Sequence, residues 1–380
     1  MEYEFHLQDP TSPSTVYLFE AIISAVRDAA EWRGMFAFAS RGGVDALLAD
    51  PEVVQFLGRG SMSLLVGIDA ITNRGTLERL RELEATYQRM MVRVFWNRTA
   101  GLFHPKISHF TYGDGRRSVI VGSGNLTPGG LRQNFEAFSV VRAGPRERLS
   151  LASWDQFLQD HAADIRAIDD AALERAALNV VRARARVREE TEPDATPVPG
   201  AEPAEPFGAE EAAPVTTNDV DRILVSSVPR AGGRWHQVHF NKEVIEQFFR
   251  VQPNSTQRVY LRECRLDGTF GDLEVRPCVL SERNLNHKIE LGSHHGATYP
   301  ADGKPIAVFR ELQARSFAYV LLMPGETGYR ESAELLNRLP KAGRGDPRAI
   351  TDLNELRRAW PASPLLTGVV VGAPEAAGPR

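Results

Sequence analysis

The sequence contains little cysteine. Its 380 residues include only two, Cys264 and Cys278, which lie 14 positions apart and belong to no CxxC pair. Two isolated thiols do not build a disulfide framework, and they supply too few ligands for a structural zinc site. We therefore expect two buried, reduced thiols.

Long apolar runs and a leader-like N-terminus are also missing. No stretch approaches the roughly 20 apolar residues that a membrane-spanning helix requires. The N-terminus, MEYEFHLQDPTSPS, is acidic and polar, whereas a secretory signal is basic and then apolar. These features predict a cytoplasmic protein that does not associate with a membrane.

One acidic, proline-rich segment divides a chain of otherwise ordinary composition, in which 42% of residues are hydrophobic and 25% charged. The segment 189–215 holds eight acidic residues, six prolines and no basic residue. Such a sequence buries too little apolar surface to fold, so we expect a linker at 189–218 between domains at 1–188 and 219–380. Outside 189–215 the chain has 45 basic and 41 acidic residues, a balance that permits DNA binding. An alternative function of the acidic segment is to mimic DNA and occupy a basic groove.

Before the linker, strand-like and helix-like segments alternate. Helical periodicity covers 13–33, 43–57 and 73–90, and it returns over 147–190. The strand-like runs are MFAFAS, SMSLLVGI, MVRVFWN, KISHFTY, RSVIVGSGN and FEAFSVVRAG. This order predicts an α/β fold.

After the linker, most segments are strand-like. The runs RILVSSV, RVYLREC, EVRPCVL, KPIAVFREL and FAYVLLMP are separated by Gly, Pro and Asn turns, and NKEVIEQFF is helical. This spacing predicts a mainly β domain, a barrel or a sandwich with a helix or two.

A His-x-Lys pair opens one of the upstream strands. His104 and Lys106 begin FHPKISHF, and residues two apart on a strand point to the same face. An imidazole and a fixed positive charge therefore lie side by side, which suits phosphoryl chemistry.

A second polar cluster follows further along the chain. Gly122 and Gly124 flank Ser123 and precede Asn125, so small donors can approach a ligand oxygen at a sharp turn. Glu136, at the start of NFEAFSVV, can hold one imidazole nitrogen and set the tautomer of the other.

These residues resemble a known family. HPK followed by GSGN is similar to the HxK…GSxN signature of the phospholipase D superfamily, over about 20–190. The resemblance implies an α/β (α+β) sheet flanked by helices and a phosphodiesterase that needs no metal and forms a covalent phosphohistidine. Superfamily members often have an aspartate five residues after the lysine, where this chain has Thr111. That departure favours the nuclease branches, with Glu136 as the substitute acid, over a lipid hydrolase.

The resemblance also implies a homodimer. The superfamily's active site uses two such signatures, and this chain contains one. Two copies of His104, Lys106 and Asn125 would surround one phosphate in an isologous dimer. One His104 would attack phosphorus while its mate protonates the leaving oxygen, and Lys106 and Asn125 would stabilise the charged oxygens.

The region 219–335 resembles the DNA-binding domain of phospholipase-D-type restriction endonucleases of the BfiI and NgoFVII kind. This resemblance implies a plant-B3-like pseudobarrel whose polar loops contact double-stranded DNA. The candidate contacts form two loops, namely Arg230, Arg234, Trp235, Gln237, Asn241 and Lys242, and then Arg283, Asn284, Asn286, His287 and Lys288.

Several residues also have simpler explanations. Ser108 and His109 are read as strand surface or core contacts, and Trp235 can serve as an aromatic anchor for its loop. The pair His294 and His295 lacks the further ligands of a metal site. Asp69 follows a strand and precedes a helix, so we expect it to cap that helix.

The sequence as a whole predicts a metal-independent restriction or phage-defence endonuclease, with a methyltransferase or another defence protein as a possible partner. One alternative is a phospholipase D or other phosphodiesterase acting on lipids or nucleotides. Another is a defence nuclease without sequence specificity that a partner activates. A third is a non-catalytic DNA-binding scaffold, against which the intact His104, Lys106 and Asn125 argue.

Overall fold

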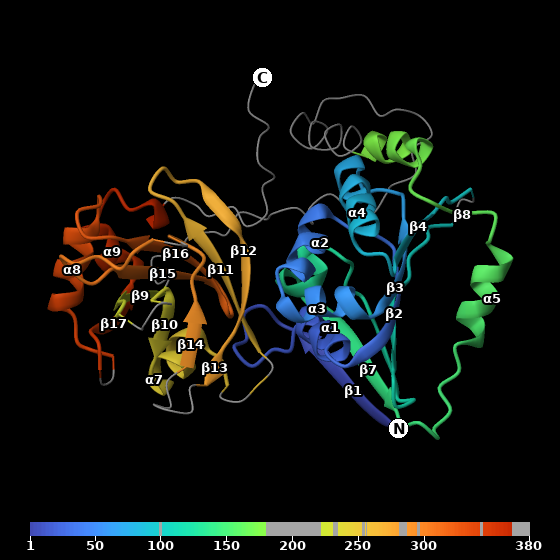
Figure 1. The fold of residues 1–380 in the computed structure, drawn as a ribbon, viewed down its shortest axis with the longest axis horizontal. Helices are drawn as coiled ribbons and strands as arrows, with labels where there is room; N and C mark the ends of the chain where they lie inside the picture. Colours follow the sequence, from blue (N-terminus) through green and yellow to red (C-terminus); the bar gives the residue numbers. More distant parts are fainter. Residues whose placement is uncertain are drawn as a thin grey trace, which may run out of the picture. The chain divides into compact units, whose positions relative to one another are not determined.

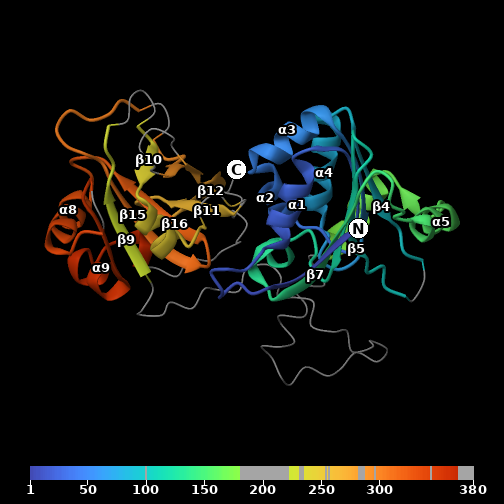
Figure 2. The same cartoon turned by 90° about the horizontal axis from the view of Figure 1, so that it is seen from below.

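A computed structural model describes residues 1–98, 101–179, 222–230, 235–252, 255, 257–280, 287–294, 297–342 and 345–366. They form two units, one from 1–9 and 15–179 and the other from 10–14 and 222–366 (Figures 1 and 2). The segment 10–14 joins the second unit through Pro10 O, which accepts a hydrogen bond from Ala314 N at 3.2 Å. The expected linker at 189–218 lies outside the described residues.

Eight strands form one sheet in the first unit. They are β1 (Glu2–Gln8), β2 (Ala29–Phe36), β3 (Ser61–Gly67), β4 (Met90–Phe95), β5 (Lys106–Tyr112), β6 (Arg117–Gly122), β7 (Glu136–Ala143) and β8 (Ile165–Arg166). Their spatial order is β1-β7-β6-β5-β2-β3-β4-β8. β2, β3 and β4 are parallel, and the remaining neighbours are antiparallel.

Helices cover the two faces of this sheet unequally. The first unit contains α1 (Leu18–Val26), α2 (Arg41–Leu48), α3 (Pro51–Arg59), α4 (Arg74–Thr86), η1 (Gly129–Gln133), α5 (Ala152–Asp160) and a helical segment at 170–179. Figures 1 and 2 show α1 to α4 on one face and α5 alone on the other. Trp154 of α5 packs on Met35 and Leu65, so α5 covers the β2 and β3 part of its face.

The α/β prediction is confirmed, but three of the expected helices differ. The helix at 13–33 is limited to α1, because Ala29–Phe36 forms β2. The helix at 43–57 is two helices, because Asp50 accepts a hydrogen bond from Glu52 N and Pro51 starts a new helix. Strand β8 interrupts the helical pattern at 147–190.

Strand β1 was not predicted. Its sequence, EYEFHLQ, alternates polar and apolar residues, which is the pattern of a half-exposed strand. The polar, acidic character of the N-terminus concealed this alternation.

The second unit contains two sheets. Its strands are β9 (Arg222–Ser227), β10 (Gln237–Phe240), β11 (Arg258–Cys264), β12 (Phe270–Pro277), β13 (Val279–Leu280), β14 (His287–Glu290), β15 (Ile306–Gln313), β16 (Ser316–Leu322) and β17 (Arg348–Asp352). Six form a mixed sheet in the order β12-β11-β16-β15-β9-β17, and three form a small sheet in the order β10-β14-β13. A mainly β unit was expected; the closed pseudobarrel stays a prediction.

Both faces of the six-stranded sheet are covered. The helical elements of this unit are α7 (Lys242–Val244), η2 (Ile245–Phe249), α8 (Tyr329–Arg338), α9 (Leu353–Ala359) and η3 (Pro364–Leu366). Alternate residues of β9 show the arrangement, because Leu224 packs with the small sheet and η2 while Ile223 and Val225 pack with α8 and α9. The expected helix at NKEVIEQFF corresponds to α7 and η2, and α8 and α9 are further helices for which the sequence analysis gave no position. Across the described ranges, no helix is both long and apolar enough to cross a membrane.

Candidate active site

The predicted catalytic residues gather at one edge of the first sheet. β2, β3, β4 and β6 end at this edge, and β5 and β7 begin there, because β5 is antiparallel to both β2 and β6, and β7 to β6. We call it the site edge. The carboxyl ends of parallel strands are where functional residues collect in α/β folds.

His104 and Lys106 lie together at the start of β5. Lys106 is buried, with 8% of its surface exposed, and His104 is exposed. The Lys106 Nζ atom lies 2.9 Å from Nε2 and 3.0 Å from Nδ1 of His104, and it donates a hydrogen bond to His104 O at 3.3 Å. The ammonium is thus fixed beside an accessible imidazole, where it can stabilise negative charge on a bound oxyanion.

Phe38 connects this pair to Asn125. The Phe38 ring packs edge-on against the His104 ring at 5.7 Å, and Phe38 N donates to Asn125 Oδ1 at 3.3 Å. Ala37 N donates to Pro105 O at 2.7 Å, so the segment after β2 also holds the backbone beside His104. Because Oδ1 is occupied, the NH₂ group is the donor end that Asn125 can offer.

Ser123 and Glu136 form a second pair, between the end of β6 and the start of β7. Ser123 Oγ donates to Glu136 Oε2 and accepts from Ala137 N at 3.0 Å. Asn134 Nδ2 donates to Glu136 Oε1 at 3.5 Å. These contacts place Glu136 with Ser123 and Asn134, and its role in holding the imidazole of His104 stays a prediction.

Close packing, and not a left-handed turn, requires the glycines of GSGN. Neither Gly122 nor Gly124 has a positive φ. A Cβ on Gly124 would lie within 2.6 Å of Gly130 O, and one on Gly122 would meet the backbone of Ala137. The sharp turn expected here is replaced by close backbone contacts that place Asn125 against Phe38.

Loops beside the site edge are held by side chains that sequence reasoning missed. Thr72 Oγ1 accepts a hydrogen bond from Ala39 N at 3.1 Å, and Asn179 Nδ2 donates to Ile68 O at 3.0 Å and to Thr72 O at 2.7 Å. Asp69 does not cap α4. It pairs with Arg175 at 2.7 Å, while Asn73 is the N-cap.

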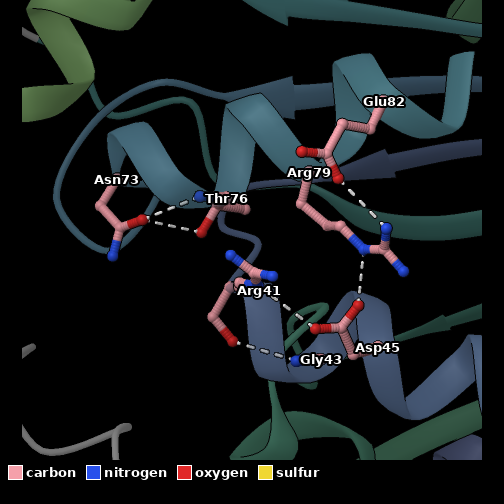
Figure 3. A network of polar contacts seen from close by, with 8 residues as sticks. Arg41, Gly43, Asp45, Asn73, Thr76, Arg79 and Glu82 are labelled. Atoms are coloured by element: carbon pink, nitrogen blue, oxygen red, sulfur yellow. Dashed lines mark hydrogen bonds and ion pairs between the residues drawn. The ribbon is translucent and has the colours of Figure 1, made fainter. Parts of the chain in front are cut away.

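A polar network ties α2 to α4 behind these loops. Arg79 pairs with Asp45 at 2.7 Å and with Glu82 at 3.2 Å, and Asp45 also pairs with Arg41 at 3.5 Å. Figure 3 shows these contacts together with the Asn73 cap of α4. Since α2 and α4 follow the loops after β2 and β3, the network helps to fix both loops.

Three other residues of β5 that the sequence singled out, Ser108, His109 and Thr111, follow Lys106 along the strand. Thr111 is near the far end of the strand, where its hydroxyl donates to Glu31 at 3.5 Å. Ser108 is buried, and His109 is buried with both ring nitrogens lacking hydrogen-bond partners. Burial lowers the pKa of His109 to about 4. The interpretation of both residues as strand or core contacts agrees with this placement.

Two predicted DNA contacts of the second unit are buried. Trp235 donates through Nε1 to Ala297 O at 2.9 Å and packs edge-on against Tyr299. It therefore anchors its loop, as the simpler explanation held. His287 is 3% exposed, on the core side of β14. Trp235 belongs to the core between the two sheets, and both ring nitrogens of His287 are buried without hydrogen-bond partners; contact of either side chain with DNA stays a prediction.

The other described candidates differ in their surroundings. Asn241 caps α7 by accepting from Val244 N at 3.0 Å. Lys242 is exposed and pairs with Glu246 at 3.6 Å, and Arg230 is exposed. Arg234, Arg283, Asn284 and Asn286 lie outside the described residues.

The small sheet has one polar face that includes two residues not predicted, His239 and Glu290. Gln237 lies opposite Glu290, and His239 lies opposite Lys288, so these four share a face. All four are half-exposed, whereas Val238 and its core-facing neighbours are buried. The alternation in QVHF was the signal for His239.

Metal-ligating groups and thiols add no further site. In the described part of the chain, no cluster of three or more His, Cys, Asp or Glu side chains could hold a metal. His294 Nε2 lies 3.2 Å from Leu321 O, and His295 lies outside the described residues. Cys264 and Cys278 are free, and burial raises the pKa of each thiol to about 12.

Comparison with known proteins gives matches among solved structures alone, since no family model and no curated protein matches. A phospholipase D family member, Nuc from Salmonella typhimurium, is 17% identical over 43% of this chain and 96% of its own, with a TM-score of 0.31. NucT from Helicobacter pylori is 12% identical over 44% of this chain and 99% of its own, with a TM-score of 0.30.

Yeast tyrosyl-DNA phosphodiesterase is also 12% identical, over 45% of this chain and 43% of its own, with a TM-score of 0.30. At identities and scores this low, a functional assignment rests on the side chains at the site edge. The chain is thus similar, over a little under half its length, to the solved structures of a phospholipase D family member, of NucT and of a tyrosyl-DNA phosphodiesterase.

Proposed function

We propose that this protein is a metal-independent endonuclease that hydrolyses DNA phosphodiester bonds through a phosphohistidine at His104. The observation that carries this proposal is the fixed pair at the start of β5, where Lys106 Nζ lies 2.9 Å from Nε2 of an exposed His104. The pair offers a nucleophile and a permanent positive charge at one point, and that charge supplies the stabilisation for which other phosphodiesterases use a divalent ion.

The reaction proceeds in two displacements. In the first, a ring nitrogen of His104 forms a bond to phosphorus as the bond to the leaving oxygen breaks, and the partner subunit's His104 gives that oxygen its proton. In the second, water attacks phosphorus, the phosphorus–nitrogen bond breaks, and the water's proton passes to the partner subunit's His104. Lys106 and the NH₂ group of Asn125 stabilise the charge on the phosphate oxygens in both steps.

One chain supplies one nucleophile, so the complete site belongs to a homodimer. A two-fold axis brings the same residues of two copies together. The exposure of His104, in contrast to the burial of Lys106 and Asn125, supports a shared site because its ring can reach a phosphate that both subunits bind.

The second unit, tethered by the acidic segment, serves as the DNA-recognition domain of a cytoplasmic restriction or phage-defence enzyme. Arg230, Lys242 and the polar face of the small sheet are the described groups that support this role. A modifying methyltransferase or another defence protein is the partner that such an enzyme requires to protect the host.

The test is cleavage of plasmid and phage DNA by purified protein in excess EDTA, across a salt series, beside the variant His104→Ala. Discrete fragments that resist EDTA and disappear in the variant are expected, with weaker binding at higher salt. Cleavage that depends on an added divalent ion would overturn metal independence. Inactivity on every DNA, together with hydrolysis of a lipid or nucleotide phosphodiester, would replace DNA as the substrate.

A further inference from the structure

Strand β1 presents its side chains in an unusual way. Its polar residues point to the helix-covered face of the sheet, where Gln8 is buried and its Oε1 accepts from Leu18 N of α1 at 2.9 Å. His6 packs on the buried ring of Phe138 on the same face. The apolar residues Tyr3 and Phe5 therefore point to the opposite face, which is the reverse of a strand that is solvated on one side.

These apolar side chains continue into an exposed patch. Tyr3, Phe5 and Leu7 are 65%, 59% and 69% exposed. Val121 of β6 belongs to the same face, because it lies opposite Ser139, which lies opposite Phe5, and it is 45% exposed. Phe135, which precedes β7 in the same alternation, is 72% exposed. We call these five residues the β1 patch.

The patch is large enough to be an interface. An aromatic side chain offers about 150–250 Å² when fully exposed, so the three aromatic residues together expose roughly 300–500 Å². Contiguous exposed apolar surface of this size marks an interaction site. The three aromatic residues alone account for about half of the roughly 800 Å² that each partner contributes to a standard protein interface.

The patch adjoins the candidate site. Leu7 lies opposite Ala137 in the β1–β7 register, and Ser123 N donates to Ala137 O at 2.9 Å. Leu7 of the patch is therefore separated from Ser123, which is exposed, by Ala137 alone. A partner seated on the patch lies beside Ser123, at the part of the site edge that β6 and β7 form, and Lys106 points to the other face because its neighbour Ile107 pairs with Val121.

We infer that the β1 patch is the surface through which two copies of this chain associate, and that it places their site edges together. The inference rests on the proposed function, which requires a second His104. An apolar face fits its own copy about a two-fold axis, whereas DNA is bound mainly by basic and polar groups. Pairing also covers β1, an edge strand whose free backbone groups and apolar face would otherwise favour aggregation.

The experiment measures molar mass in solution together with DNA cleavage. The double variant Phe5→Glu, Leu7→Glu introduces negative charges into the interface from both subunits. We expect the dissociation constant of the dimer to rise about a hundred-fold or more. Phe135→Glu lies outside the strand and is the second variant, so that a folding defect of β1 cannot explain the result. Val54→Glu, at a 41% exposed apolar residue of α3, is the matched control and stays dimeric.

The outcomes separate the interface from the function. A dimeric wild type whose patch variants are folded monomers supports the interface, whether or not the wild type cleaves DNA. An active dimer that the patch variants leave intact overturns the interface and leaves the nuclease proposal standing. A wild type that is monomeric at micromolar concentration overturns the interface, and activity of that monomer would also overturn the shared site.

Discussion

The two units hold their polar side chains in different ways. At the site edge, Lys106 and Asn125 are buried, and both are fixed in place, one beside His104 and the other on the backbone of Phe38. On the small sheet of the second unit, Lys288 is half-exposed on a polar face, and so is Gln237, which donates a hydrogen bond to Glu290 at 3.3 Å. Fixed, buried groups are suited to catalysis, because a displacement of about 1 Å lowers the reaction rate. Exposed groups are suited to contact with the phosphate backbone of a long nucleic acid.

The sharpest way to break this comparison is to remove the nucleophile. His104→Ala is expected to lower the rate of DNA cleavage by about 10⁴-fold or more, because no other group then forms the covalent intermediate. DNA binding, measured by gel shift, is expected to stay close to that of the wild type. His161→Ala, at the end of α5, is the control; loss of cleavage in both variants would remove the special status of His104.

Asn125 gives the next largest effect. Asn125→Ala is expected to lower kcat by about 10²–10³-fold through loss of one donor to the phosphate oxygens. Asn125→Asp keeps the shape and the acceptor for Phe38 N, so it separates donor loss from disruption of the fold. Full activity of Asn125→Asp, with an unchanged melting temperature, would contradict the donor role.

A buried histidine of the same strand, His109, extends the comparison to stability. Burial lowers the folded-state pKa of His109 to about 4, whereas the ordinary value is about 6.5. Between pH 6.5 and pH 4, His109 is therefore protonated in the unfolded chain but not in the folded one. The free energy of unfolding has its full value above pH 6.5 and falls as the pH drops toward 4, by up to about 3 kcal/mol. Denaturant unfolding across this range should show a flatter pH dependence for His109→Phe. An equal fall in both proteins would rule His109 out as the source.

The smallest effect is expected on the second unit. Lys288→Ala should weaken DNA binding several-fold and lower the slope of log K against log salt by about 1, while kcat at saturating DNA is unchanged. Lys304→Ala, which removes a lysine paired with Asp346 at 2.6 Å, is the matched control. A change in kcat, or equal weakening in both variants, would count against a recognition surface at the small sheet.

The sequence predicted that HPK and GSGN lie close together, because the pairing of two neighbouring strands determines which of their residues lie side by side. KISHFTY was predicted as a strand, and it is β5, with Lys106 at its start. Once β5 and β6 pair, GSGN must end at the edge where HPK begins. The contact between Asn125 and Phe38 joins segments far apart in the chain, so it depends on tertiary packing that no local pattern carries.

The loops of the second unit show where such reasoning fails. Trp235 and His287 belong to polar stretches, but both side chains are buried, and Trp235 is part of the core between the two sheets. In a loop or a short strand, the direction of each side chain is set by the unit that it packs against, and composition alone does not reveal it. The missed strand β1 is a related case, because its alternation was present but its apolar side faces outward.

The measurement that tests the central claim most directly is capture of the covalent intermediate. Protein is quenched under denaturing conditions during turnover of end-labelled DNA, and the labelled peptide is mapped and tested for stability to acid and base. A label on His104 that acid releases and base does not, present in Ser123→Ala and absent in His104→Ala, is the predicted result. An acid-stable label on Ser123, or rapid cleavage by wild-type protein with no labelled intermediate, would contradict a phosphohistidine mechanism.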